Sequence, residues 1–486
     1  MPETQRNAWK LFALAVCCIS FLSIIHPVFI MYVSIDNFDP SIDDKRRIFI
    51  YEYMIGALRK NSLPSEGYQK RPETQHIDCG RVLGGDKSYT EKLIGENRIP
   101  LIQNGLLNMS CPDIQNRIHP NNRNFIPLKS GGIAFARIVY TDYEFIEKQL
   151  EMLWHPQNVF CFTVDKKSPI EFISRMKKLE ECLENVIVLP ATESYDSSGH
   201  NMNIGQKRCM EALLPKTGWK YILFLQNFDV IVKSVYELER IYELLGGVND
   251  IHYCKEVEGR RIPGLSWDPK SMHLFRNESG ISEKVLHSPM RVFSGSEQAS
   301  LSRAAVKWLI EDVDMNIVIE QFNRTAYGCD EQLFPSLQLN YEYGMPGHFT
   351  DQCPNYDGPK QITRMTQWAN GDVNNCPSKI VRHGICLIGI EQLEELSKIP
   401  HIMVNKMIPS FDYSVIECTA ELLYNRTFLG QKDHQLDEKF YEELLHVTYY
   451  KHHNDPGYQL NCTTPNTLEN YLRIRNISLG PLVRSD

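Results

Sequence analysis

A buried β-strand is predicted by the stretch Gly132-Ile133-Ala134-Phe135-Ala136-Arg137-Ile138-Val139-Tyr140, in which a single arginine interrupts apolar residues. The residues after it have a helical pattern, with Ile146, Leu150 and Trp154 on one face. A second apolar run, residues 159–165, then ends in an aspartate. Alternation of strand and helix is typical of a mostly parallel sheet covered by helices, so we expect an α/β fold here.

The alternation continues along the chain. Helical patterns and apolar runs take turns over residues 170–183 (helix), 186–190 (strand), 205–214 (helix) and 221–226 (strand). Ligands of such sheets bind beyond the carboxyl ends of the strands, where Asp165 and the segment 227–229 fall. Aspartate at a strand end is also a common turn former, so these positions alone do not define a site.

The later parts of the chain are less regular. Residues 249–290 are polar, and we expect no regular element there. A helix is expected over about residues 302–311 and a strand over 384–389. Residues 431–486 have a polar composition that predicts a tail-like C-terminal extension, in which His452 and His453 are solvated.

Composition narrows the class of protein. A chain of 486 residues is long enough for one large catalytic domain with additions. Hydrophobic residues at 42% and charged residues at 23% are ordinary values for a globular protein. The net charge is -8, and no basic stripe with interleaved aromatic residues is present. We therefore expect no nucleic-acid partner.

Residues 11–33 form an apolar run long enough to span a bilayer. A cleaved signal peptide is the alternative, but the run is long for one and no clear small-x-small cleavage site follows it. The charge rule for orientation is ambiguous, because basic residues stand on both sides of the run, at Arg6 and Lys10 and again at 45–47.

We favour a signal anchor of a single-pass type II membrane protein. In this interpretation residues 1–10 are cytosolic, 11–33 cross the membrane, 34–128 form a lumenal stem and 129–430 form the catalytic domain. Two features favour a lumenal body. Of the fourteen cysteines, twelve lie beyond the apolar run, and they lack the paired spacing of zinc sites and so predict disulfides. Glycosylation sequons occur at Asn108, Asn277, Asn323, Asn425, Asn461 and Asn476.

A pair of carboxylates is the first candidate for chemistry. Asp330 and Glu331 stand between Gly328 and the apolar run 333–337, and a carboxylate at such an edge can have its pKa tuned for accepting a proton. The alternative is a solvated pair at a helix N-terminus. The sequence Asp312-Val313-Asp314 has the letters of a metal-binding motif but continues a helical run, so we expect no metal site there.

The order of these segments resembles the core-2/I-branching β-1,6-N-acetylglucosaminyltransferases, glycosyltransferase family 14. The resemblance covers about residues 130 to 420. It is carried by residues 134–140, 159–165, 219–229, 295–296, 301–303, 330–331, 381–389 and 404–406. Each block is loose, whereas their order and spacing together are specific. The extent of divergence indicates a side branch of the family.

The resemblance implies a Golgi enzyme with a GT-A-like nucleotide-sugar fold that uses a UDP-sugar, no divalent metal and no other cofactor. Glu331 takes the position of the family's general base, with Cys329 in place of a proline. Arg382 and Lys406 match the cations that the family places on the UDP diphosphate. Two fixed cations can stabilise a leaving diphosphate in place of a metal.

The resemblance also implies substrate contacts. Ile138, Val139, Tyr140 and Asp165 match positions that line the uridine site. Asp330 and Trp368 are candidates for binding the acceptor, since an aromatic face can stack on a sugar; a core tryptophan is the alternative. The family's acceptor-binding Glu, Lys and Arg have no defined match between about 249 and 262, where the charged residues are Glu256, Glu258, Arg260 and Arg261.

The family's disulfides imply four pairs in this chain. These pairs are Cys79 with Cys418, Cys111 with Cys182, Cys161 with Cys209, and Cys376 with Cys386. The other lumenal cysteines have no counterpart, namely Cys254, Cys329, Cys353 and Cys462.

We therefore expect an inverting transferase that moves a sugar, N-acetylglucosamine by resemblance, from UDP to a hydroxyl of a protein-linked glycan. One alternative keeps the fold and transfers xylose or glucose. Another is a catalytically silent lumenal protein that binds glycans. A membrane-anchored adhesion or receptor module is a further alternative, and it would need no cluster of acids and cations at the strand ends.

Overall fold

The computed structural model describes residues 67–119, 125–353, 361–430, 435–463, 468–475 and 477. The expected cytosolic tail and membrane anchor, residues 1–33, lie outside this part of the chain, as do residues 34–66 of the expected stem. Within the described residues, none of the helices combines the length and hydropathy needed to span a bilayer. The anchor therefore stays a prediction.

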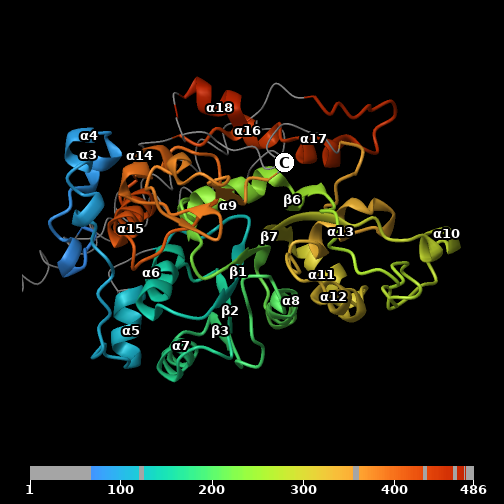
Figure 1. Cartoon of the computed structure of the whole chain (residues 1–486), viewed down its shortest axis with the longest axis horizontal. Helices are drawn as coiled ribbons and strands as arrows, with labels where there is room; N and C mark the ends of the chain where they lie inside the picture. Colours follow the sequence, from blue (N-terminus) through green and yellow to red (C-terminus); the bar gives the residue numbers. More distant parts are fainter. Residues whose placement is uncertain are drawn as a thin grey trace, which may run out of the picture. The chain divides into compact units, whose positions relative to one another are not determined.

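The main sheet has six strands in the order β3-β2-β1-β4-β7-β6 (Figure 1). Their bounds are β1 Gly132–Val139, β2 Val159–Val164, β3 Val186–Leu189, β4 Trp219–Leu225, β6 Asp250–Lys255 and β7 Phe293–Ser302. Strands β3, β2, β1 and β4 are parallel, whereas β7 is antiparallel to both β4 and β6. The prediction of a mostly parallel sheet is confirmed.

Helices cover both faces of this sheet (Figure 1). Strand β1 is buried along its whole length because Ile133, Phe135 and Val139 pack into one hydrophobic cluster while Ala134 and Ala136 pack into another. The first cluster includes α6 (Tyr143–Leu153), α7 (Ile170–Cys182) and α9 (Val235–Leu245). The second includes α8 (Met202–Leu213), α11 (Arg303–Glu311), α12 (Asn316–Asn323) and α13 (Leu333–Leu339). The small alanines allow α8 to lie close to β1.

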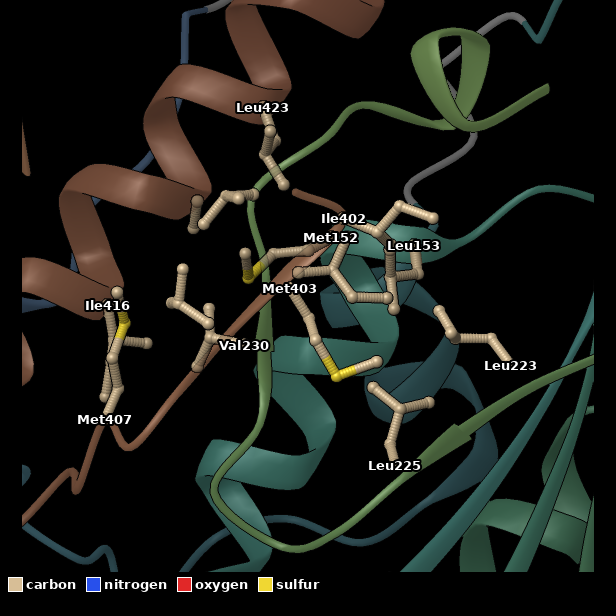
Figure 2. Close-up of a cluster of buried hydrophobic side chains, with 14 of the residues drawn as sticks. Met152, Leu153, Leu223, Leu225, Val230, Ile402, Met403, Met407, Ile416 and Leu423 are labelled. Atoms are coloured by element: carbon tan, nitrogen blue, oxygen red, sulfur yellow. The ribbon is translucent and has the colours of Figure 1, made fainter. Parts of the chain in front are cut away.

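A second, three-stranded sheet has the order β5-β11-β8. Its strands are β5 (Val230–Ile231), β11 (Met403–Asn405) and β8 (Arg364–Thr366). Figure 2 shows how it is held: Met403 and Val230 meet Met152 of α6 and Leu225 of β4 in one buried cluster. Since β5 directly follows the end of β4, this packing brings the residue after β11, Lys406, near the carboxyl end of the main sheet.

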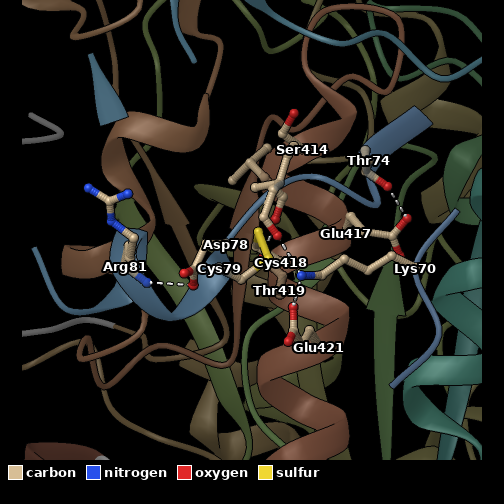
Figure 3. Close-up of a disulfide and its surroundings, with 12 residues drawn as sticks. Lys70, Thr74, Asp78, Cys79, Arg81, Ser414, Glu417, Cys418, Thr419 and Glu421 are labelled. Carbon is tan, nitrogen blue, oxygen red and sulfur yellow. Dashed lines mark hydrogen bonds and ion pairs between the residues drawn. A yellow bond between two sulfur atoms is a disulfide. The ribbon is translucent and has the colours of Figure 1, made fainter. Parts of the chain in front are cut away.

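The described part of the expected stem packs on the body. Helix α3 (Cys79–Leu83) is tied to α15 (Tyr413–Phe428) by the Cys79–Cys418 disulfide (Figure 3). Nearby, Lys70 pairs with Glu421 at 2.9 Å. The other short elements are α4 (Lys87–Thr90), α5 (Cys111–Ile118), α10 (Glu283–His287), α14 (Leu393–Leu396), β9 (Val381–Arg382) and β10 (Ile385–Cys386). Short 3₁₀ helices lie at Pro72–Thr74, Gly95–Asn97, Tyr341–Tyr343, Val373–Asn375 and Ile390–Gln392.

The C-terminal segment is not a solvated tail. It contains α16 (Glu438–Glu442), α17 (Leu445–His452) and α18 (Leu468–Ile474). Tyr441 is 1% exposed and its hydroxyl donates to the carbonyl of Pro400 at 2.7 Å. The expectation of a tail was wrong because a few widely spaced apolar side chains are enough to anchor short helices on a larger core. His452 is exposed, as expected, whereas the ring of His453 stacks on Tyr449.

All four predicted disulfides are present. Their Cα–Cα distances are 5.3 Å (Cys79–Cys418), 5.0 Å (Cys111–Cys182), 5.7 Å (Cys161–Cys209) and 5.3 Å (Cys376–Cys386). A fifth disulfide, Cys353–Cys462, joins the C-terminal segment to the body. Neither Cys254 nor Cys329 belongs to any of these five disulfides.

Candidate active site

Polar side chains gather at the carboxyl ends of β1, β2 and β4. The amide oxygen of Asn227 accepts hydrogen bonds from the backbone N–H groups of Tyr140 at 2.8 Å and Thr141 at 3.3 Å. Asp165 accepts from the backbone N–H groups of Lys167 at 2.7 Å and Tyr195 at 3.3 Å. These bonds fix the loops after the strands and leave the Tyr140 ring 37% exposed.

The residues predicted to line the uridine site do not have equal access to it. Val139 is fully buried and Ile138 is 6% exposed, so they support the site from beneath. Asp165 is also 6% exposed, because its carboxylate is occupied by backbone N–H groups. Tyr140 is the one of these four residues that presents a ring to solvent.

A group of cations lies beside Tyr140. The Nη2 atom of Arg382, in β9, is 3.4 Å from the Tyr140 hydroxyl, and the guanidinium carbon is 5.4 Å from the centre of the Phe228 ring. Burial, together with the nearby charges of Arg364 and Arg382, lowers the pKa of Lys406 to about 8. A cation held among cations is a binding element for an anion, because a bound negative charge relieves the repulsion.

The carboxylates Asp330 and Glu331 lie on the loop between α12 and α13. Glu331 has a side chain that is 29% exposed, and its Oε2 accepts a hydrogen bond from Nη1 of Arg260 at 2.7 Å. Asp330 is 7% exposed. Burial, together with the charge of Glu331, raises the pKa of Asp330 to about 7. The pair thus has one buried and one accessible member, and Glu331 is the accessible one.

Hydrogen bonds hold this loop against α8 and the segment that precedes it. The N–H of Cys329 donates to the carbonyl of Ser198 at 3.1 Å, and Asn203 Nδ2 donates to the carbonyl of Cys329 at 3.0 Å. A Cβ on Gly199 would lie 1.9 Å from Oδ1 of Asp330, so this close approach requires glycine. Cys329 stands where the family pattern has a proline. Its buried thiol donates to the carbonyl of Thr325 at 3.3 Å.

Two site residues could not be identified from the sequence. Arg260 was one of several charged residues in an undefined register, and the structure separates it from Arg261, which pairs with Glu256 at 2.9 Å. Arg364 stands in no motif at all. Its charge nevertheless opposes the rise in the pKa of Asp330 and adds to the fall in the pKa of Lys406, so it lies within electrostatic range of both. Through Nη2 it also donates to Oδ1 of Asn405, the residue before Lys406, at 2.8 Å.

Trp368 lies on the cation side of this site. A Cβ on Gly384 would be 3.5 Å from the Trp368 ring, and the N–H of Ala369 donates to the Gly384 carbonyl at 2.9 Å. The backbone next to Arg382 therefore packs against the ring, which is only half-buried. Acceptor binding by Trp368 stays a prediction.

The Asp312-Val313-Asp314 motif has ordinary structural contacts. Asp312 ends α11, and Asp314 accepts from the N–H of Asn316 at 3.0 Å through Oδ1. Over the described residues, His, Cys, Asp and Glu side chains form no group of three or more that could hold a metal ion. Metal independence of the reaction stays a prediction.

The sequons differ in accessibility. Asn108, Asn277 and Asn461 are exposed. Asn323 is half-buried and its amide exchanges hydrogen bonds with Asn201 at 3.0 and 3.2 Å. Asn425 is half-buried within α15, and Asn476 lies outside the described residues.

Comparisons with known proteins agree with the resemblance. A family model described as "Branch: Core-2/I-Branching enzyme" matches residues 133–397, more than half of the chain. The protein therefore belongs to the core-2/I-branching enzyme family, and with the family the prediction of a glycosyltransferase is confirmed.

Curated relatives give the distance within the family. The chain is 26% identical over 419 residues to beta-1,3-galactosyl-O-glycosyl-glycoprotein beta-1,6-N-acetylglucosaminyltransferase 3 of Ovis aries, covering 80% of this chain and 90% of the relative. The enzyme of the same name from Bos taurus is 27% identical over 419 residues, which again cover 80% of this chain and 90% of the relative. Enzyme 4 of Danio rerio is 26% identical over 300 residues, covering 60% of this chain and 69% of the relative. At these identities the chain is a divergent member of the core-2/I-branching enzyme family.

Proposed function

We propose that this protein is an inverting, metal-independent glycosyltransferase that moves N-acetylglucosamine from UDP to a hydroxyl of a protein-linked glycan. The observation that carries the proposal is the position of Arg364, which donates at 2.8 Å to Asn405, the residue before Lys406, and whose charge also opposes the rise in the pKa of Asp330. This position supports placing an acid for the acceptor and a cation for the leaving group in one site. The names of the relatives support the choice of sugar and of a glycoprotein acceptor. The mostly parallel sheet supports a GT-A-like fold.

Glu331 is the general base of the proposed reaction. Its carboxylate takes the proton of the acceptor hydroxyl as the hydroxyl oxygen forms a bond to the anomeric carbon of the sugar. The bond from that carbon to the phosphate oxygen breaks on the opposite face, so the configuration inverts and UDP carries away the electron pair. One carboxylate is enough for this single displacement, and no covalent intermediate forms.

Arg260 orients this base. It donates to Oε2 of Glu331 at 2.7 Å, and we assign the acceptor proton to the other oxygen, Oε1. The Arg260 side chain also lies over the Tyr327 ring, with 5.4 Å between the guanidinium carbon and the ring centre. Tyr327 is 52% exposed, so an acceptor sugar approaching Glu331 meets an aromatic ring and a cation at the same point.

Arg382 and Lys406 bind the diphosphate in this proposal. Negative charge develops on the leaving UDP, and fixed cations stabilise it without reorganisation. The exposed Tyr140 ring, which touches Arg382, is assigned to the uridine end of the donor together with Asp165 beneath it. The site thus orders uridine, diphosphate, sugar and acceptor from β1 toward the α12–α13 loop.

We place the protein in the Golgi membrane with a lumenal catalytic domain. The disulfides support an oxidising compartment, and glycoprotein acceptors of the relatives support the secretory pathway.

The test of the proposed activity is a transfer assay with the purified full chain, UDP-N-acetylglucosamine, UDP-xylose and UDP-glucose, and mixed glycoprotein acceptors. Transfer from UDP-N-acetylglucosamine supports the proposal. Transfer only from another donor would mean that the transferred sugar is xylose or glucose. If the protein neither transfers sugar nor hydrolyses a donor, the silent glycan-binding protein is favoured.

A further inference from the structure

Five buried or half-buried side chains form a closed ring of hydrogen bonds. Arg364 donates through Nη1 to the Ser296 hydroxyl at 3.2 Å and through Nη2 to Oδ1 of Asn405 at 2.8 Å. The Ser296 hydroxyl donates to Oε1 of Gln298 at 2.9 Å. Gln298 and Asn405 then donate to the two oxygens of Asp229, at 3.0 and 2.7 Å. Each member is bonded to two others, so the ring has no open end.

The ring joins the two sheets. Ser296 and Gln298 belong to β7 of the main sheet, whereas Arg364 and Asn405 belong to β8 and β11 of the small sheet. Asp229 lies between β4 and β5, and its Oδ2 also accepts from the N–H of Gln226 at 2.6 Å. Asp229 is 0% exposed, and Gln298 and Asn405 are each 1% exposed. Water therefore does not compete for the bonds that Gln298 and Asn405 donate to Asp229.

Two members of the ring, Asn405 and Ser296, lie next to the two halves of the proposed site. On one side, Asn405 directly precedes Lys406. On the other side, Gly295 directly precedes Ser296, and a Cβ on Gly295 would lie 3.1 Å from Cγ of Pro335 in α13. Helix α13 begins just after Glu331. A shift of β7 relative to β11 would thus change the distance between Lys406 and Glu331.

We propose that the ring closed by Arg364 is a positioning device that sets the spacing between the donor cation Lys406 and the general base Glu331. This inference rests on the proposed function. A buried acid and a buried cation stabilise a fold weakly, since apolar side chains of equal volume would do as well. A closed polar ring instead favours one arrangement of the elements that it joins, which is what a reaction between two separately held substrates requires.

The charges around Arg364 fit this role. Glu297, next to Ser296, is 3% exposed and its Oε1 accepts from Gln206 Nε2 at 2.8 Å. Burial raises the pKa of Glu297 well above its usual range, and the charges of Asp330 and Asp229 raise it further, while Arg364 opposes the rise. The charge of Arg364 acts on Glu297, on Asp330 and on Lys406, whereas Arg260 acts on Asp330 from the acceptor side.

The test compares the full-length parent with Gln298→Leu, Arg364→Lys and the double variant. Gln298→Leu removes the bonds to Ser296 and Asp229 without changing any charge. The control is Arg303→Lys, because Arg303 also donates through both terminal nitrogens, at 2.9 Å to the Lys216 carbonyl and 2.7 Å to the Leu214 carbonyl, at the opposite end of β4. The measured quantities are the Kd of UDP by calorimetry and kcat and KM for donor and acceptor.

Each ring variant should weaken UDP binding and lower kcat at least about threefold, and Arg303→Lys should change neither by that much. The double variant should lose no more than the worse single variant, because both break the same ring. Ser296→Ala is the milder substitution if Gln298→Leu fails to fold. Unchanged UDP affinity and kcat in folded ring variants, or losses that simply multiply, would overturn the ring while leaving the proposed function intact. A parent protein that neither binds UDP nor transfers sugar would overturn both.

Discussion

Arg260 Nη1 lies 2.7 Å from Oε2 of Glu331, and this contact joins a polar loop after β6 to the carboxylate loop between α12 and α13. The carboxylate is only partly exposed, so the bond is shielded from water more than a surface ion pair is. It holds Glu331 in one orientation, which a general base needs in order to meet an acceptor hydroxyl.

Arg260→Met should lower kcat/KM for the acceptor about 10- to 100-fold, the size expected for one lost charged hydrogen bond, and should leave the Kd of UDP unchanged. The adjacent Arg261→Met is the matched control. Arg261 pairs with Glu256 at 2.9 Å but its side chain is 38% exposed, so its loss should cost little. Equal losses in the two variants would show that the Arg260–Glu331 bond has no special role.

The binding of UDP should depend on pH through Lys406. Its pKa of about 8 means that the positive form dominates below that pH and is lost above it. The Kd of UDP should therefore rise as the pH increases through about 8, and in Lys406→Arg the rise should be absent because arginine stays charged. Calorimetric titration across this range measures the effect. If the Kd of UDP rises equally in the parent protein and in Lys406→Arg, the pH dependence belongs to another group.

Transfer should continue in the presence of a chelator such as EDTA. In our account Arg382 and Lys406 supply the positive charge at the diphosphate that a divalent metal supplies in other enzymes. Initial rates with and without EDTA, and with added Mn²⁺, make the comparison. Complete loss of activity in EDTA with recovery in Mn²⁺ would contradict the assignment of these cations.

The lumenal location predicts N-linked glycans. In a secretory cell line, the full chain should lose mass on treatment with a glycosidase, and replacing the exposed Asn108, Asn277 and Asn461 by Gln should remove most of that loss. Asn323→Gln should have no effect, because the Asn323 amide is bonded to Asn201. A chain whose mass does not change on treatment would exclude the lumenal assignment.

The sequence predicted best those elements whose pattern is local. Strands β1 to β4 are apolar runs, and the helices between them have one apolar face, so periodicity was sufficient. Strand β7 was missed because its residues Ser294 to Gln298 are polar, and they are buried only because partners such as Arg364 come from 68 residues away. The same reason applies to β6 and to the Cys353–Cys462 disulfide, whose sequence separation is 109.

The site was predictable where a motif existed and not elsewhere. Glu331, Arg382 and Lys406 were assigned because the residues around them match a family pattern. Arg364 and Arg260 have no such pattern, and their roles depend on distances that only the folded chain defines. The sequence could not show that Asp330 is buried while Glu331 is accessible, since adjacent residues differ in this way only through their surroundings.

The most direct measurement of the central claim is sugar transfer by Glu331→Gln together with UDP binding by the same protein. The amide keeps the shape of the side chain and the bond to Arg260 but cannot accept the acceptor proton. We expect transfer to fall by about 10²- to 10⁴-fold while the Kd of UDP stays at the parent value. Transfer by Glu331→Gln at the parent rate, with Asp330→Asn inactive, would mean that the general base is the other carboxylate.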